Sequence, residues 1–388
     1  KNTSSNDKFS FHRNFSSFKV DSFLQDLSVF SCDDVYRSEC PNKAYNHFWD
    51  TFRTFFDLRF PSVRSRINKN NTPVNNFMTS GLLKSRKTKL KLARKAKVNP
   101  SIENIDRSRT YRNIYNALMR KAKKLFFKKR LAESYDNSKK LWQVINEACN
   151  KRSKSDSIDK LKIGDDIISD PQQIANHFNE HFSQVGKRTV ASLPTKNVNF
   201  RDYLPPPNPH SFFMLPTAPG EVLQVILGIK KKESCDVNDI SFKLLQKVAC
   251  PISKPLAFIF NLSIEKGIFP EKMKISKTIP IFKKGSPLDL ENHRGVSIVD
   301  SFSKIFEKLG STRLIDFLTR SGFFYDKQFA FLKGRSTNHA ILQIFNFITN
   351  AINHRKYTLA IFLDVAKAFD SVDHQILFSK LENAGIRG

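Results

Sequence analysis

The sequence predicts an α+β fold for residues 218–388, preceded by a mainly helical, basic extension. Apolar residues recur at helical spacing in segments such as Phe302–Leu318, whereas Thr278–Phe282 and Tyr357–Leu363 are short apolar runs typical of strands. Positive charge concentrates in one window: residues 81–130 contain 18 Lys and Arg against two acids, so this window alone carries +16. A folded C-terminal part and a polyanion-binding extension are therefore expected.

The first segment, residues 1–80, is polar and rich in Phe, and it ends in a linker. Asp21–Phe30 and Tyr45–Phe56 are predicted as short helices, and residues 61–80 are rich in Asn, Ser and Pro. The 36 Phe residues of the chain suggest either base stacking or core packing, and we predict core packing.

The second segment, residues 81–190, is predicted as a basic, helical, nucleic-acid-binding extension. A helix over 81–98 ends before Pro100, and a second spans 111–133, where apolar residues form a stripe at helical spacing. The other faces carry cations that can meet phosphates; those assigned to nucleic-acid binding are Arg120, Lys121, Lys123, Lys124 and Lys128. The net charge of +29 and pI of about 9.9 indicate salt-sensitive binding to a polyanion.

The remainder of the extension alternates helices with turns. Lys139–Ala148 is predicted as a helix with Trp142 in the core, Leu161–Ser169 as a hairpin, and Pro171–Val185 as a helix. Residues 191–217 are dense in proline, so we predict a linker and a domain boundary there.

Residues 218–388 are predicted to alternate helices with two strands, and the second strand carries the most informative residues. The apolar run Leu359–Leu363 is expected to be a buried strand that delivers the Asp364 carboxylate to its end. The further helices are predicted over Glu221–Ile229, Phe242–Ala249, Pro255–Lys266, Phe302–Leu318, Ala340–Ile352 and Asp373–Asn383.

The residues around Asp364 suit nucleotidyl transfer. This reaction uses two Mg²⁺ ions held by hard oxygen ligands, for which Asp364 and the carbonyl of Val365 are candidates. The bulky Phe369 could exclude a ribose 2′-hydroxyl. Lys283 in a turn and Arg294 could clamp a triphosphate. A plain helix cap for Asp364 and an ordinary basic turn around Lys283 are the alternatives.

A second basic loop, Gln328–Thr337, contains aromatic residues and opens a helix. Gln328, Lys333 and Arg335 could line a template or nucleotide groove, although an ordinary helix start has the same pattern. Gly164-Asp165-Asp166 is predicted to be a hairpin turn and not a catalytic acid pair.

Other function classes lack support. The five cysteines form no CxxC pair, which argues against a disulfide framework and a zinc module, and the chain has no apolar run of about 20 residues. A small-molecule phosphotransferase would use a glycine-rich loop such as GxxxxGK[ST], and none occurs.

Four ordered blocks resemble the reverse transcriptases of non-LTR (LINE-type) retrotransposons, particularly the Jockey and CR1-like groups. They are IPIFKKG and NxRxxS within 279–297, QFxFxKGRST at 328–337, FLDxxKAFDxVDHxIL at 362–377, and the segment 251–270 before them. Similarity covers residues 190–388 and extends over 45–190. Usual family residues are missing at Gly295, Ala330 and Leu332, and the 234–241 block lacks its glycines.

The resemblance implies the fingers and partial palm of a right-hand polymerase in residues 218–388. It implies that Asp364 is the first catalytic carboxylate and a metal ligand with Val365. It makes Phe369 the sugar gate, and it places Lys283, Arg294 and Gln328 near the incoming nucleotide. An aromatic-x-Asp-Asp turn would complete the metal site and is not in this sequence, so we expect a truncated, internal piece of a longer polyprotein.

The resemblance thus predicts an RNA-directed DNA polymerase, expected to be inactive as an isolated fragment. The alternative is a decayed, non-enzymatic remnant that binds nucleic acid. Expected partners are an RNA template, a DNA primer and deoxynucleoside triphosphates, with no membrane. The expected location is intracellular, in the nucleus or a cytoplasmic ribonucleoprotein.

Overall fold

The computed structural model describes residues 9–66, 77–135, 137–149, 158–191, 199–365 and 367–387. It forms two compact units, one of residues 1–12 and 64–157, the other of residues 13–63 and 158–388. Parts of the predicted linkers at 61–80 and 191–217 lie outside the described residues.

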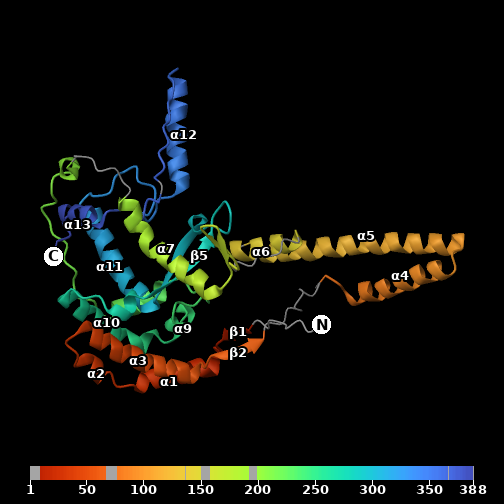
Figure 1. Cartoon of the computed structure of the whole chain (residues 1–388), viewed down its shortest axis with the longest axis horizontal. Helices are drawn as coiled ribbons and strands as arrows, with labels where there is room; N and C mark the ends of the chain where they lie inside the picture. Colours follow the sequence, from red (N-terminus) through yellow and green to blue (C-terminus); the bar gives the residue numbers. More distant parts are fainter. Residues whose placement is uncertain are drawn as a thin grey trace. The chain divides into compact units, whose positions relative to one another are not determined.

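The first unit is built around a long helical hairpin. Helices α4 (Ser80–Val98) and α5 (Ile102–Glu133) pack against each other, and α6 (Ser138–Ala148) packs on α5 (Figure 1). The side chains of Thr79 and Ser101 accept hydrogen bonds from the backbone N–H groups of Leu82 and Asn104, which fixes where α4 and α5 begin. The predicted helices are confirmed, with α5 starting nine residues before the predicted 111–133.

Few side chains hold this hairpin together. Leu82 and Tyr115 are its buried residues. The prediction that Trp142 docks in a core was wrong, since its side chain is 62% exposed. Val144 is the buried residue of α6, and two residues along a helix turn through about 200°, so Trp142 faces away from that contact. Strands β1 (Phe9–His12) and β2 (Val63–Arg66) form a two-stranded sheet.

The core of the second unit is helical. Its elements are α1 (Ser17–Val29), α2 (Asp33–Tyr36), α3 (Pro41–Arg59), α8 (Pro219–Gly228), α9 (Phe242–Lys247), α10 (Ala249–Lys266) and α11 (Ser301–Arg320). Helices α1 and α3 bury their apolar faces in the same cluster as α8, α9, α10 and α11. Composition alone marked residues 1–80 as a separate segment, whereas the structure places 13–63 with the C-terminal part.

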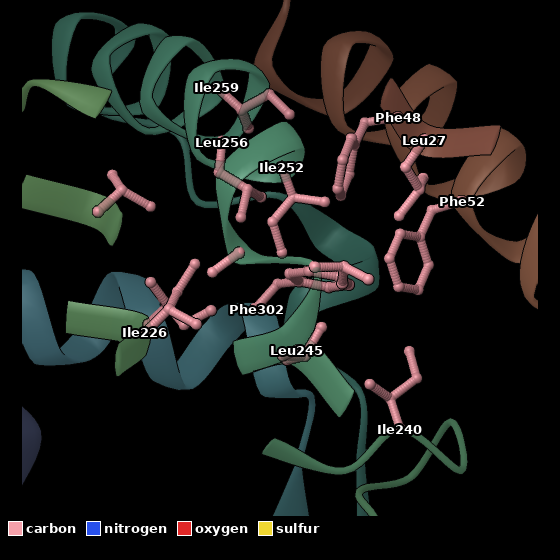
Figure 2. Packing of buried hydrophobic residues seen from close by; sticks show 14 of the residues in the cluster. Leu27, Phe48, Phe52, Ile226, Ile240, Leu245, Ile252, Leu256, Ile259 and Phe302 are labelled. Atoms are coloured by element: carbon pink, nitrogen blue, oxygen red, sulfur yellow. The ribbon is translucent and has the colours of Figure 1, made fainter. Parts of the chain in front are cut away.

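Phenylalanine packing explains this grouping. Phe48, Phe52 and Phe56 lie at four-residue spacing on α3, so they share one face. The Phe302 ring of α11 lies edge-on to the rings of Phe48 and Phe52, at centroid distances of 5.3 Å in both cases (Figure 2). Edge-to-face aromatic pairs add stability beyond the area they bury. Core packing is therefore confirmed for these residues.

A buried carboxylate joins the start of α11 to the loop before α9. Asp300 caps α11 by accepting hydrogen bonds from the N–H groups of Phe302 and Ser303, and it also accepts one from the Asn238 side chain at 2.7 Å. The neighbouring carboxylate of Asp236 accepts a hydrogen bond from Ser301 N–H at 2.8 Å. Burial, with Asp236 nearby, raises the pKa of Asp300 to about 6.

Two hairpins and one helix lie beside the core. Strands β3 (Leu161–Ile163) and β4 (Asp166–Ile168) pair antiparallel around Gly164, as predicted. Helix α7 (Pro171–Ala191) follows. Strands β5 (Ser276–Phe282) and β6 (His293–Val299) form a second antiparallel hairpin. In this second hairpin, β5 was predicted from the sequence and β6 was not.

The C-terminal part contains α12 (Thr337–Asn353), which projects from its unit, and α13 (His374–Asn383) (Figure 1). The buried strand predicted at Tyr357–Leu363 was wrong. Leu359 and Leu363 are 87% and 90% exposed, and within the described residues no strand pairs with this segment. A strand needs a neighbour for its backbone hydrogen bonds, which an apolar pattern cannot supply by itself.

Residues 205–212 run along the end of α13. Asn208 N–H donates to the carbonyl of Asn383 at 2.8 Å, and Phe212 N–H donates to that of Gly385 at 2.7 Å. A cavity of about 710 Å³ lies beside this contact, lined by Arg201, Pro206, Glu382 and Arg387 among others. None of the site residues predicted from the sequence lines it.

Candidate functional site

The β5–β6 hairpin places two of the predicted phosphate-binding cations on one face. In its register Ile281 pairs with Arg294, and directly paired residues of an antiparallel ladder share a face. Lys283 lies two residues beyond Ile281, so its side chain leaves on the same side. Lys283 and Arg294 are both exposed, so this face can meet an anion.

A glycine makes the turn of this hairpin possible. Gly285 has a φ of +86°, and a β-carbon there would lie 2.7 Å from the side-chain nitrogen of Asn292. Asn292 is held in place because its amide donates to the Ser286 carbonyl at 3.0 Å and to the Asp289 carboxylate at 3.2 Å. The Lys283 N–H donates to the Asn292 carbonyl at 2.9 Å. These contacts fix the backbone that carries Lys283.

The opposite face of the hairpin packs against α7. The Phe178 ring lies 5.1 Å from the His293 ring, edge-on, and a β-carbon at Gly295 would lie 3.1 Å from the Phe182 ring. Gly295 therefore allows the close approach of α7. Helix α7 thus covers one face of the hairpin, and the face with Lys283 and Arg294 stays open.

The loop that contains the predicted catalytic residues is tied to this hairpin by Lys367. The Lys367 ammonium lies 3.0 Å from Glu291, one residue before Asn292, and Glu291 lies 3.7 Å from the ring of His181 on α7. The hydrogen bond from Lys367 lowers the pKa of Glu291, while burial lowers the pKa of His181. The Asp370 carbonyl would lie 3.5 Å from a β-carbon at Gly186.

The 328–337 loop also reaches this region. The rings of Phe331 and Phe369 lie 6.1 Å apart, edge to face, so the predicted sugar gate contacts the predicted template loop. Gln328 donates to the Ala330 carbonyl at 3.2 Å, and the Arg335 guanidinium donates to the Asp326 carbonyl and lies over the Phe329 ring. Lys333 is exposed.

The described residues do not complete a magnesium centre. Asp364 is exposed, as is Val365, and together they offer one carboxylate and one carbonyl. Across the described ranges, no group of three or more His, Cys, Asp or Glu side chains could hold a metal ion. Two octahedral ions need more oxygen ligands than these residues supply, so no chemical step is assigned to a metal here.

The predicted nucleic-acid-binding cations of α5 lie in the first unit. Arg120, Lys121, Lys124 and Lys128 are exposed, whereas Lys123 is half-buried with its ammonium 5.8 Å from the centre of the Phe127 ring. Most of these cations are therefore available to solvent.

Sequence reasoning missed Glu291 and His181. Glu291 contacts Lys367 in the loop from Asp364 to Asp370, which we call the motif loop, and His181 contacts Glu291. Neither residue has a spacing that marks it out. The one available signal for Glu291 was its position directly before the NxRxxS block, three residues from Arg294.

Part of the chain matches a known protein family. Residues 281–388 match the family described as "Reverse transcriptase (RNA-dependent DNA polymerase)". This match includes Lys283, Arg294, Gln328, Asp364 and Phe369. Residues 281–388 therefore resemble a reverse transcriptase domain.

Curated relatives that the chain resembles come from transposable elements. The chain is 26% identical over 272 residues to the "Probable RNA-directed DNA polymerase from transposon BS" of Drosophila melanogaster, covering 68% of this chain and 30% of that protein. It is 33% identical over 126 residues to the "RNA-directed DNA polymerase from mobile element jockey" of the same species, covering 32% and 14%. The resemblance to non-LTR retrotransposon reverse transcriptases is confirmed, and the chain spans less than a third of either relative.

Proposed function

We propose that this chain carries the triphosphate-binding part of an RNA-directed DNA polymerase of a non-LTR retrotransposon. In this proposal, residues 218–388 are the fingers and the beginning of the palm of a right-hand polymerase. The observation that carries it is the shared, exposed face of Lys283 and Arg294, both of which lie within the family match that starts at residue 281.

The roles follow from position and charge. Arg294 binds phosphate oxygens through its planar fork and Lys283 as a point charge, so together they neutralise an incoming triphosphate. Phe369, in contact with Phe331, excludes a 2′-hydroxyl by its bulk. Gln328, Lys333 and Arg335 contact the template or nucleotide. When bound, Mg²⁺ would supply charge stabilisation, with Asp364 and the Val365 carbonyl as ligands, but the centre is incomplete in the described residues.

Nucleotide binding tests this proposal directly. Titrating a fluorescent deoxynucleoside triphosphate into the chain should give at least tenfold weaker binding for Lys283→Gln and Arg294→Gln. The matched control is Lys277→Gln, which lies on the same strand about 20 Å from Lys283. Equal affinity of all three variants and the parent chain would contradict the proposal.

Primer extension on a primed RNA tests the synthetic activity. Incorporation in the presence of Mg²⁺ should be lost in Asp364→Asn. Activity that persists in this variant would remove Asp364 from the catalytic role.

A second candidate function is binding to nucleic acid without synthesis, in a cellular ribonucleoprotein. The specific observation in its favour is that no group of three or more His, Cys, Asp or Glu side chains among the described residues could hold a metal ion. Retention of primed RNA without any incorporation would support this candidate. No helix in the described part of the chain is long and apolar enough to cross a membrane.

A further inference from the structure

Helix α4 carries a stripe of positive charge on its outer side. It contains eight Lys and Arg residues and no acid. Seven of them are exposed, and five of these recur at spacings of three or four residues, with the last two adjacent: Lys84, Lys87, Lys91, Arg94 and Lys95. At about 100° per residue, these five side chains fall within roughly 100° of one another around the helix. They form one face, which we call the α4 stripe.

The side of α4 opposite this stripe is used for packing. Leu82 is buried, the Ser85 hydroxyl lies 3.0 Å from the Tyr111 hydroxyl, and Lys89 lies 4.6 Å from the centre of the Tyr115 ring. These residues, with the half-buried Leu92 and Ala96, recur at alternating spacings of three and four residues, as in a seam between two helices. Contact with α5 therefore fixes which way the α4 stripe faces.

The cations of α4 differ from those at the end of α5. There Arg130 pairs with Glu147, and Lys129 lies 3.9 Å from Glu133. Within the described residues, no ion pair involves the five side chains of the α4 stripe. Like charges at these spacings repel, so the stripe lowers the stability of α4 as long as no anion is bound.

We propose that the α4 stripe binds the phosphate backbone of a nucleic acid, at a surface separate from the nucleotide-binding hairpin. The stripe is about 16 Å long, and its charges lie about 5–6 Å apart, which suits a row of backbone phosphates. A row of regularly spaced cations matches phosphates, which carry no sequence information, so binding is expected to depend little on sequence. This inference extends the proposed function, because it gives the same chain a second contact with template or target.

The observations favour nucleic acid over a membrane surface. A helix that lies on a membrane needs a broad apolar face free of other contacts. In α4 the side opposite the cations is occupied by α5. The net charge of +29 on the whole chain also favours a polyanion of high charge density.

The test compares two fivefold neutralised chains. The stripe variant changes Lys84, Lys87, Lys91, Arg94 and Lys95 to Gln. The control variant changes five exposed lysines of the second unit to Gln: Lys230, Lys231, Lys232, Lys308 and Lys380. Binding to a labelled single-stranded RNA of uniform sequence is measured by fluorescence anisotropy between 50 and 300 mM salt, in EDTA and without nucleotide.

The stripe variant should reduce the slope of log K against log salt by roughly 3–4, at about 0.7 per lost phosphate contact, and the control variant by less than 1. A variant with the four stripe lysines changed to Arg keeps the charge and should therefore keep the slope of the parent chain. Circular dichroism should show that all variants have the helix content of the parent chain. Equal slopes for the stripe and control variants would overturn the proposal.

Vesicles containing anionic lipid provide the other decisive comparison. Loss of vesicle binding in the stripe variant with unchanged RNA binding would also overturn the proposal. Because no Mg²⁺ or nucleotide is present, the result does not depend on whether the chain can synthesise DNA.

Discussion

Asp300 is a carboxyl group that the fold buries almost completely at the start of α11. Its pKa is raised to about 6, mainly by burial, although the N–H groups of Ser303 and Phe302 and the Asn238 amide favour the charged form. The folded state therefore holds this proton more tightly than the unfolded state does. The stability gained is complete below about pH 4 and is lost as the pH rises through about 6.

This sign gives a prediction for pH dependence. Lowering the pH from 7 to 5 should increase the free energy of unfolding of the second unit by about 1 kcal/mol through Asp300. Asp300→Asn should remove that increment, because the amide oxygen can still cap α11 but no longer titrates. Denaturant unfolding at both pH values measures it, with Asp316→Asn, exposed on the same helix, as control. An unchanged increment in Asp300→Asn would contradict the assignment.

Asp239 has a backbone conformation that suits glycine. Its φ is +66°, in the left-handed region that residues with a β-carbon rarely adopt. Asp239→Gly should raise the free energy of unfolding by about 0.5 kcal/mol, since relief of strain exceeds the entropy cost of glycine. Thermal or denaturant unfolding measures the change. Asp239→Asn controls for the loss of the ion pair with Arg13, whose side chain is nearly buried, and lower stability of the glycine variant than of the asparagine variant would refute the prediction.

Helix α4 is an element whose stability should depend on salt. Across α4 and α5, the described side chains that are buried are Leu82 and Tyr115, so little apolar burial opposes the repulsion along the α4 stripe. Raising the salt from 50 to 300 mM should slow hydrogen exchange of α4 amides several-fold by screening. Amides of the buried helix α10 provide the internal control. Exchange in α4 that is independent of salt would show that repulsion is not important there.

The elements also show what the sequence could and could not predict. Helices such as α3 and α11 were predicted because apolar residues at helical spacing mark the buried face directly. Strand β6 was missed because Arg294, Gly295 and Ser297 interrupt any apolar pattern, and the strand is defined by its pairing with β5. The prediction of a strand at Tyr357–Leu363 was wrong for the opposite reason. Its apolar pattern is clear, but no described strand pairs with it.

At the candidate site, the motifs identified Lys283, Arg294 and Phe369 as functional residues. They did not predict the contacts that hold these residues in place. Shared faces follow from strand register, and the Glu291–Lys367 contact joins segments far apart in the sequence. The spacing of residues within one motif contains neither the strand register nor such a long-range contact. Whether Asp364 shares a site with Lys283 and Arg294 stays a prediction.

At the scale of the whole chain, composition and packing group the residues differently. Polarity marked residues 1–80 as separate, yet residues 13–63 pack in the same core as α8, α10 and α11 through their Phe side chains. The apolar side chains of α12 and of 357–365 are exposed instead, among them Phe345, Ile361 and Phe362. The predicted domain boundaries at 80, 190 and 217 stay predictions.

The turn of the β5–β6 hairpin makes the Gly285 codon sensitive to substitution. Every missense change in a glycine codon introduces a β-carbon, and the pinned side chain of Asn292 already occupies that space. Random drift at this codon would therefore disrupt the turn at the first substitution. Genomic copies that retain glycine here, while exposed codons nearby diverge, would identify lineages in which selection has continued to maintain the turn.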